Sequence, residues 1–283
     1  MSNNIDKVHS IIEVGCEMVG AASGGVLGFF MGGPLGAPVG AAAGGAAGVA
    51  ISKASTKVLI DVANRSLSQR EEIRIGAAAT FAIQNIQRKL ESGEHPRNDG
   101  FFQTQQYASR TSAEEIFEGV LLKSKNEHEE KKVRIFGNIF ANISFTPGLG
   151  GGEANHILQI AENLTYRQMC LLALFHRKEE IRDLHLAESL SSSQSFETIS
   201  TLQEIYQLYN FGLLASPIPQ ESGSSGYSDA SISSENYLAL LNWENVNPSQ
   251  IELTPLAKRY YVVMGLDEIP STDLRDVAIF LVT

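Results

Sequence analysis

The sequence contains little cysteine and little charge. Its 283 residues include 2 cysteines, Cys16 and Cys170, which excludes a disulfide scaffold and fits a reducing compartment. Charged residues make up 19% of the chain and apolar residues 43%, so the chain is too apolar to be disordered throughout. Acidic residues outnumber basic ones by 32 to 22, and the net charge of −10 disfavours a broad nucleic-acid-binding surface. The length suits one large domain or two modest ones.

Motifs of catalytic chemistry are also missing. There is no His-Glu-x-x-His, no metal-spaced cysteine pair and no Gly-x-Ser-x-Gly elbow. The glycine stretch 148–152 lacks the Lys-Ser/Thr of a phosphate-binding loop and follows a helical pattern, so it predicts a connector. His176, Glu180 and Asp183 share a helix face, but interleaved basic residues indicate a salt-bridged surface helix. We therefore predict a protein that is not an enzyme, with no catalytic, cofactor-binding or metal-binding residues.

Charge is absent altogether between Met18 and Ser52, a run of 35 residues that holds 11 of the 25 glycines. Such a run exceeds the roughly 20 apolar residues that a bilayer-spanning helix needs. Small residues at every fourth position line one side of a helix and let a second backbone approach closely. The glycines with this spacing, which we predict to be helix-packing and membrane positions together with Phe29 and Phe30, are Gly20, Gly24, Gly28, Gly32, Gly36, Gly40, Gly44 and Gly48.

Two prolines divide this uncharged segment. Pro34 and Pro38 remove backbone donors and restrict the residues before them, which predicts a turn or kink between two helical arms. The arms, about 16 residues ending at Gly33 and about 14 residues beginning at Val39, are each only ~21–24 Å long. Because the hydrocarbon core is about 30 Å thick, a deeply entering hairpin fits better than two comfortable spans.

The sequence argues against three other interpretations of the segment. A cleaved signal peptide needs a basic N-terminal region, where this chain has Asp6, Glu13 and Glu17. Glu13 also argues against a lipoprotein cysteine at Cys16, and a flexible linker would not need eight glycines in one register. A helical hairpin packed inside a soluble oligomer stays open as an alternative. The pattern resembles the glycine-zipper segments of bacterial membrane proteins, and this resemblance implies helix packing within a membrane.

The middle of the chain, residues 55–152, is predicted to be helical. Ser68 and Glu71 form a capping-box pattern that opens a helix ending near Ser92, and Ser112 with Glu115 predicts a second such start. Residues 93–100 are a predicted loop. The charged stretch 123–132 is typical of a solvated helix face, and an apolar helix face follows over 133–143.

The C-terminal part, residues 153–283, changes character. It shows a helix from Leu164 to Phe175 with Cys170 as a core thiol, and a helix over 196–214 that ends in Gly-Leu-Leu. A Ser/Gly-rich loop over 216–236, a short strand over 251–253 and a helix opened by Thr254-Pro255 follow. This order resembles a winged-helix domain, which implies an α+β fold, whereas an ordinary α-helical domain is the alternative.

The acidity of the chain is concentrated in this C-terminal part. Residues 155–283 carry 7 basic and 16 acidic residues, whereas the first 154 residues are nearly neutral. A DNA-reading domain needs a basic face. We therefore expect a protein partner or dimerisation for the winged-helix-like domain, and we do not expect a nucleic-acid partner.

Several short sequence motifs over residues 130–260 also resemble those of a known family. The helix 134–142 (RIFGNIFAN), the glycine loop, the helix that begins at Leu164-Thr165 and the late phrase Leu253-Thr254-Pro255-Leu256 resemble the abortive-infection alpha family of bacterial phage-defence proteins. The chain departs from the pattern in having Ala257 where a glycine is expected, and in its serine-rich insertion. The resemblance implies a role in phage-triggered growth arrest, and no catalytic motif comes with it.

The sequence thus predicts a mainly α protein with three parts: a glycine-zipper helical hairpin (1–54), a helical region (55–152) and a winged-helix-like α+β domain (153–283). The predicted function is that of a non-enzymatic bacterial effector that oligomerises and perturbs the inner membrane from the cytoplasm. The alternative is a soluble oligomeric adaptor or regulator whose winged-helix-like domain binds a protein partner.

Overall fold

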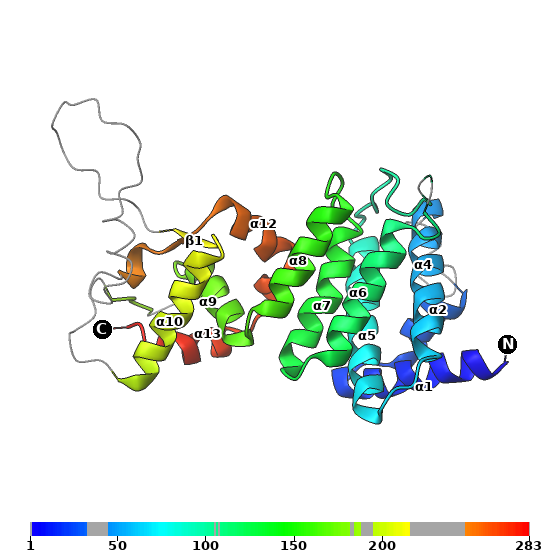
Figure 1. Ribbon diagram of the computed structural model, residues 1–283, viewed down its shortest axis with the longest axis horizontal. Coiled ribbons are helices and arrows are strands. Elements are labelled where there is room, and N and C mark those ends of the chain that lie inside the picture. The colour runs from blue at the N-terminus through cyan, green and yellow to red at the C-terminus, as the bar shows by residue number, and fades with distance from the viewer. Residues whose placement is uncertain are drawn as a thin grey trace. The chain divides into compact units, whose positions relative to one another are not determined.

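The computed structural model describes residues 2–32, 45–104, 106, 108–181, 184–187, 195–215 and 247–282. Within these residues the protein is mainly α-helical, as predicted, with a two-stranded antiparallel sheet near the C-terminal end (Figure 1). By contacts, the chain divides into unit 1, Met1–Tyr166 with Val263–Gly265, and unit 2, Arg167–Val262 with Leu266–Thr283. The helices of unit 1 are α1 (Ser2–Val19), α2 (Ser23–Gly32), α4 (Gly45–Ala63), α5 (Gln69–Glu91), α6 (Ser112–Asn126), α7 (Glu130–Ile143) and α8 (Gly151–Asn163).

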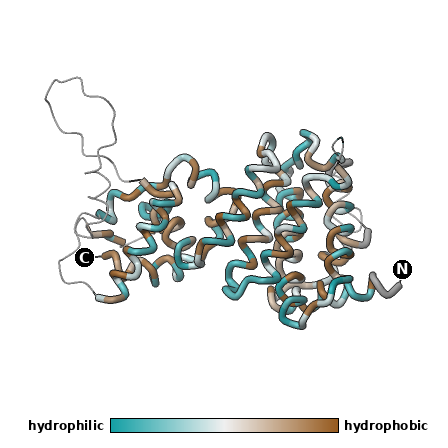
Figure 2. Tube along the Cα trace, viewed as in Figure 1, coloured by the Kyte–Doolittle hydropathy of each residue, from teal (hydrophilic) through white to brown (hydrophobic). Residues whose placement is uncertain are grey.

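Helix α5 is the centre of unit 1. It contacts α1, α2, α6 and α7, while α4 packs on α6, and α8 packs on α6 and α7. Figure 1 shows α4, α5, α6, α7 and α8 running alongside one another, with α1 lying across them. Small buried residues on α5, among them Ala77, Ala78, Ala79 and Ala82, let its neighbours approach closely. The longer helices of the unit, such as α5 and α7, alternate apolar and polar stretches along their traces, as Figure 2 shows, because one face meets the core.

One predicted helix start is confirmed and another is displaced by one residue. Ser68 caps α5, and its backbone N–H donates to Glu71 Oε2 at 2.6 Å. Helix α6 is capped by Thr111 and not by Ser112: Thr111 Oγ1 accepts from the backbone N–H of Glu114 at 3.1 Å. Both Thr111 and Ser112 fit the capping-box pattern. The bridge between Thr104 and Thr111 decides between them, because it holds Thr111 in the extended backbone that a cap requires.

The prediction of a solvated helix face over 123–132 is wrong for Glu127 and Lys132, although the other charged residues of the stretch are exposed or half-buried. Helix α6 ends at Asn126 and α7 begins at Glu130, and the turn between them buries both Glu127 and Lys132. Lys132 Nζ lies 2.7 Å from Glu127 Oε2 and donates to the carbonyl oxygen of Glu162 at 3.1 Å. Burial raises the pKa of Glu127, but hydrogen bonds from Lys132 and from backbone N–H groups outweigh it, and the net pKa is lowered. This buried ion pair joins the α6–α7 turn to α8.

The glycine stretch that was predicted as a connector begins α8. Gly150 is the N-cap of α8, Leu149 is buried, and the backbone N–H of Gly148 donates to Asp99 Oδ2 at 2.8 Å. Because α8 packs on α6 and α7, the division between the units falls at Tyr166, whereas the sequence suggested 152/153.

Unit 2 contains most of α9 (Tyr166–Arg177), then α10 (Phe196–Asn210), α12 (Pro255–Met264) for most of its length and α13 (Ser271–Ala278). Its strands β1 (Leu214–Ala215) and β2 (Glu252–Leu253) pair antiparallel, with Leu214 opposite Leu253. Two short 3₁₀ helices, Pro248–Gln250 and Leu266–Glu268, precede β2 and follow α12. Cys170 is buried on α9, as predicted for a core thiol.

Side chains tie the elements of unit 2 together. Arg167 on α9 donates to Glu204 Oε2 of α10 at 2.7 Å and to Ser200 Oγ at 2.8 Å. Gly212 has a φ of 67°, which turns the chain from α10 into β1. Thr254 caps α12 by accepting from the backbone N–H of Ala257 at 3.1 Å, so the predicted Thr-Pro helix start is confirmed.

Candidate functional site

The described residues of the uncharged segment 18–52 belong to α1, α2 and α4 and to the turn between α1 and α2. Gly20 follows α1, whereas Gly24, Gly28 and Gly32 belong to α2. Gly48 is a buried position of α4. Gly36, Gly40 and Gly44 lie outside the described residues, as do Pro34 and Pro38. Among the residues that the structure describes, no helix is both long enough and apolar enough to span a membrane.

The first predicted arm is interrupted at Gly20. This residue has a φ of 71°, in the left-handed region that favours glycine, and it ends α1. The backbone N–H of Ala21 donates to the carbonyl of Cys16 at 2.9 Å, and that of Gly20 donates to the carbonyl of Glu17 at 3.2 Å, which is the Schellman pattern. The arm expected to extend unbroken to Gly33 is therefore a 10-residue helix, α2, preceded by a sharp turn.

Three apolar residues of α2 face protein. Val26, Phe29 and Phe30 are buried, at 2%, 1% and 3% exposure, and α2 packs on α1, α4 and α5. The two phenylalanine rings meet edge to face with centroids 6.1 Å apart. Gly24 and Gly25 are exposed on the same helix, and a Cβ added at either would meet no atom within 4 Å. In this conformation the aromatic pair is covered and part of the glycine edge is open.

Side chains of α4 and α5 hydrogen-bond to the backbone of α2. Ser52 Oγ donates to the carbonyl oxygen of Phe29 at 2.7 Å, and Thr56 Oγ1 donates to that of Phe30 at 2.9 Å. Gln87 Nε2 of α5 donates to the carbonyl oxygen of Gly25 at 3.2 Å.

Two helix backbones approach closely where α1 crosses α5, at glycines that the register did not include. A Cβ added at Gly76 would lie 1.9 Å from the carbonyl oxygen of Ile11, and one added at Gly15 would lie 2.1 Å from the carbonyl carbon of Gly76. No side chain fits at either position. The sequence signal for this crossing is weak: Gly15 follows the apolar residues of an amphipathic helix, and Gly76 begins a run of small residues.

Cys16 lies beside this crossing. Its side chain is buried, at 1% exposure, and Sγ lies 3.4 Å from Thr80 Oγ1 of α5. Burial raises the pKa of the Cys16 thiol, and the charge of Glu13 adds to the effect, while the hydrogen bond with Thr80 opposes it. A buried, protonated thiol is a packing residue and not a nucleophile.

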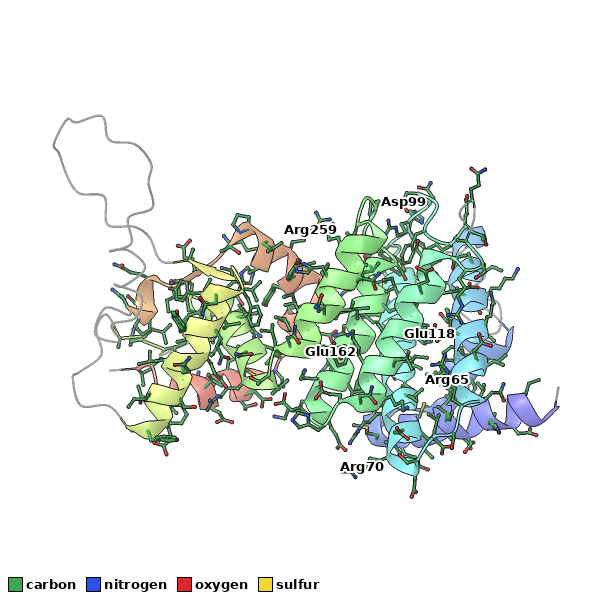
Figure 3. All side chains as sticks on the ribbon, viewed as in Figure 1. Arg65, Arg70, Asp99, Glu118, Glu162 and Arg259 are labelled. Atoms are coloured by element: carbon green, nitrogen blue, oxygen red, sulfur yellow. The ribbon has the colours of Figure 1, made fainter. Side chains whose placement is uncertain are left out.

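Ion pairs join α4 to α6, and we call them the α4–α6 charge network. Lys57 Nζ lies 3.0 Å from Glu114 Oε1, and Arg110 Nη2 lies 3.1 Å from Asp61 Oδ2. Glu118 accepts hydrogen bonds from both Arg65 and Arg110; Figure 3 labels Arg65 and Glu118. Burial raises the pKa of Glu118, but these two guanidinium groups outweigh it, and the net pKa is lowered. The network fixes the charged side of α4 to α6.

A pocket of about 380 Å³ lies where the loop after α5 meets the starts of α6 and α8, with Arg97 and Asp99 in its wall. Arg97 is buried, and its guanidinium forms two hydrogen bonds of 2.7 Å with Asp99. The guanidinium carbon also lies 4.4 Å from the centre of the Phe101 ring. Because Asp99 neutralises Arg97 and lies across it, the pair holds the loop in place and leaves no free cation for an anionic ligand.

The three residues Glu127, His128 and Glu129 offer oxygen and nitrogen atoms within 4.8 Å of one another, a spacing that a metal ion requires. Lys132 already occupies this position, since its Nζ lies 2.7 Å from Glu127 and 4.0 Å from Glu129. The arrangement is therefore that of a buried ion pair.

No family model matches the chain, and searches of curated proteins and of solved structures found no match either. The resemblances to glycine-zipper segments and to the abortive-infection alpha family stay predictions.

Proposed function

We propose that the protein is a non-enzymatic bacterial effector that acts from the cytoplasm on the inner membrane, through self-association and insertion of its glycine-rich hairpin. The observation that carries the proposal is the 35-residue run without charge, in which eight glycines recur at every fourth position. In water each interior helix glycine costs ~1 kcal/mol relative to alanine, so this pattern is favourable only where a second backbone packs against it. The abortive-infection resemblance supports a role in phage defence.

The conformation described here is, under this proposal, the state before insertion. Exposing Val26, Phe29 and Phe30 to water would cost about 4–9 kcal/mol, at ~1.5–3 kcal/mol for each buried side chain. A bilayer offsets that cost because it accepts the same apolar surface. Gly24 and Gly25, in contrast, are already open in this state. A second helix could pack against them without any rearrangement of α2. The proposal therefore involves two states, of which lipid favours the second.

In this proposal unit 2 stays outside the membrane, and we interpret it as a winged-helix-like domain. The order of α9, α10, the β1–β2 pair and α12 along the chain supports this interpretation, in which α10 would be the helix that faces a ligand. Phe196 and Ile199 are exposed on α10, at 81% and 43%. An apolar face on an acidic domain supports a protein partner over nucleic acid.

This exposed face favours the second candidate, a soluble oligomeric adaptor or regulator that binds a protein partner through unit 2. Fractionation distinguishes the two candidates. The effector is expected in the membrane pellet after activation and to require detergent for recovery, and this behaviour should be lost when residues 18–52 are deleted. Complete recovery in the high-speed supernatant, under conditions in which cells are growth-arrested by the protein, would favour the adaptor.

The effector proposal is tested by Gly24→Leu, with Gly25→Leu as the matched control. Both positions are exposed on α2 and have open space around a Cβ, so both variants should keep the wild-type fold. Only Gly24 belongs to the four-residue register. We expect Gly24→Leu to abolish dye release from phosphatidylethanolamine–phosphatidylglycerol vesicles, and Gly25→Leu to retain it. Equal release by the two variants would contradict the packing role of the register.

A further inference from the structure

The C-terminal turn of α2 ends against α4. Phe29 and Phe30 lie in the last turn of α2, and the backbone carbonyl of each accepts a hydrogen bond from outside the helix. The residue four places after Phe30 is Pro34, which has no backbone N–H to donate. Such carbonyls must be satisfied by water, by a capping turn or by another part of the protein. Both residues are at most 3% exposed, which leaves little access for water. The donors that the described residues supply to these carbonyls come from a neighbouring element.

Two hydroxyl groups of α4 provide these donors. Ser52 and Thr56 are four residues apart and lie on one face of α4, so their hydroxyls follow each other by one helical turn. They donate to the consecutive carbonyls of Phe29 and Phe30, at 2.7 Å and 2.9 Å. We call these two residues the hydroxyl clasp. Ser55, between them, donates instead to the carbonyl of Ile51 in its own helix, at 2.8 Å, and so takes no part in the clasp.

We infer that the hydroxyl clasp is the restraint that keeps α2 closed on α4 and so keeps the aromatic pair away from lipid. Detaching α2 breaks both hydrogen bonds at once and leaves two carbonyls to find other donors. A bilayer core contains no donors, so the clasp opposes direct transfer of this turn into lipid more strongly than transfer into water. The inference rests on the proposed function only where it says that the detached α2 enters lipid. The clasp itself is formed in the protein without lipid.

The test is the double variant Ser52→Ala/Thr56→Val, which removes both hydroxyls and nearly preserves side-chain volume. The matched control is Ser55→Ala, which removes a buried hydroxyl from the same helix without touching α2. A second variant, Thr56→Ser, keeps the donor and should behave as wild type. The measurement is amide hydrogen exchange of the full chain without lipid, compared over Ser23–Gly32 and, as an internal reference, over Glu130–Ile143 in α7.

We expect exchange over α2 to rise roughly fivefold to a hundredfold in the double variant, from the usual net contribution of two buried hydrogen bonds. Exchange in α7 should stay unchanged, and Ser55→Ala should leave α2 at the wild-type rate. Wild-type exchange over α2 in the double variant would overturn the inference. An equal rise over α2 and α7 would also overturn it, because the hydroxyls would then stabilise the whole unit and not α2 in particular.

Vesicle dye release is measured separately on the same variants. Faster release by the double variant supports both the clasp and the membrane proposal. Faster exchange over α2 without any dye release, under conditions in which lipid is present, contradicts the membrane proposal and leaves the clasp standing. The two failures are thus distinguishable.

Discussion

The crossing of α1 and α5 gives the sharpest stability prediction, through Gly76→Ala. In an ordinary helix position this substitution stabilises, because alanine is about 1 kcal/mol more favourable than glycine. At Gly76 the new Cβ would lie 1.9 Å from the carbonyl oxygen of Ile11, whereas an ordinary carbon–oxygen contact is about 3.3 Å. The obstacle is backbone on both sides, so no side-chain rotation relieves it. Helix α1 has to move away by more than about 1 Å.

The magnitude follows from what α1 loses by moving. Overpacking a core costs about 1–3 kcal/mol, and more where backbone is involved. Complete detachment of α1 sets the ceiling, since the four buried side chains Val8, Ile11, Ile12 and Cys16 each contribute ~1.5–3 kcal/mol at most. Because this clash is with backbone, its cost exceeds the usual range for overpacking and stays below the ceiling. The gain in helix propensity, about 1 kcal/mol, is subtracted from that cost. We therefore expect Gly76→Ala to lower the free energy of unfolding of unit 1 by about 2–4 kcal/mol.

Urea denaturation followed by far-ultraviolet circular dichroism measures this loss, and alkylation of Cys16 in native buffer reports whether α1 alone is released. The control is Gly119→Ala in α6, where the new Cβ would lie 3.2 Å from Leu158 Cδ1, the end of a flexible side chain. That variant should stay within about 1 kcal/mol of wild type. If Gly76→Ala is as stable as Gly119→Ala, the glycine crossing is not the constraint that we describe.

Three further predictions concern the charged and thiol groups. Glu118→Gln should lower stability by roughly 1 kcal/mol at low salt, and the difference from wild type should shrink in 1 M salt because partly exposed pairs are screened; a salt-independent difference would contradict the role of the α4–α6 charge network. Lys132→Met should cost about 3–5 kcal/mol near neutral pH, because Glu127 remains buried without its cation. The lowered pKa of Glu127 makes wild type lose stability as pH falls, whereas acid should partly restore the variant, so parallel pH profiles in denaturation experiments would be inconsistent with the pair. Cys16 and Cys170 should resist alkylation in the native protein and react in urea, as mass spectrometry can show; rapid native labelling of either would contradict their burial.

Much of the helical framework could be predicted from local sequence. The capping box at Ser68 and the Thr-Pro start at Thr254 act within one turn of chain, so pattern alone identifies them. The one-residue error at the start of α6, where the cap is Thr111 and not Ser112, shows the limit of prediction from local sequence. Two overlapping patterns were equally good locally, and a bridge to Thr104 from another part of the loop decided between them.

The charged stretch 123–132 was misread for a related reason. Sequence shows that Glu127 and Lys132 are charged, and charged residues are usually solvated. It does not show that the carbonyl of Glu162, from α8, completes the hydrogen bonding of a buried ammonium group. Burial of charge depends on partners that are distant along the chain.

The sequence by itself determined that one segment of 35 residues carries no charge and that its glycines fall in register, because composition and spacing are properties of the chain alone. It also determined that α2 would be apolar enough to need a covering surface. Only the tertiary structure decided what covers it. Val26, Phe29 and Phe30 pack among protein helices, and Ser52 and Thr56 donate to the carbonyls of the last turn of α2. A close contact between helix backbones falls at Gly15 and Gly76, outside the register. A close approach needs two partners at one point in space, and the sequence specifies each partner without specifying where they meet.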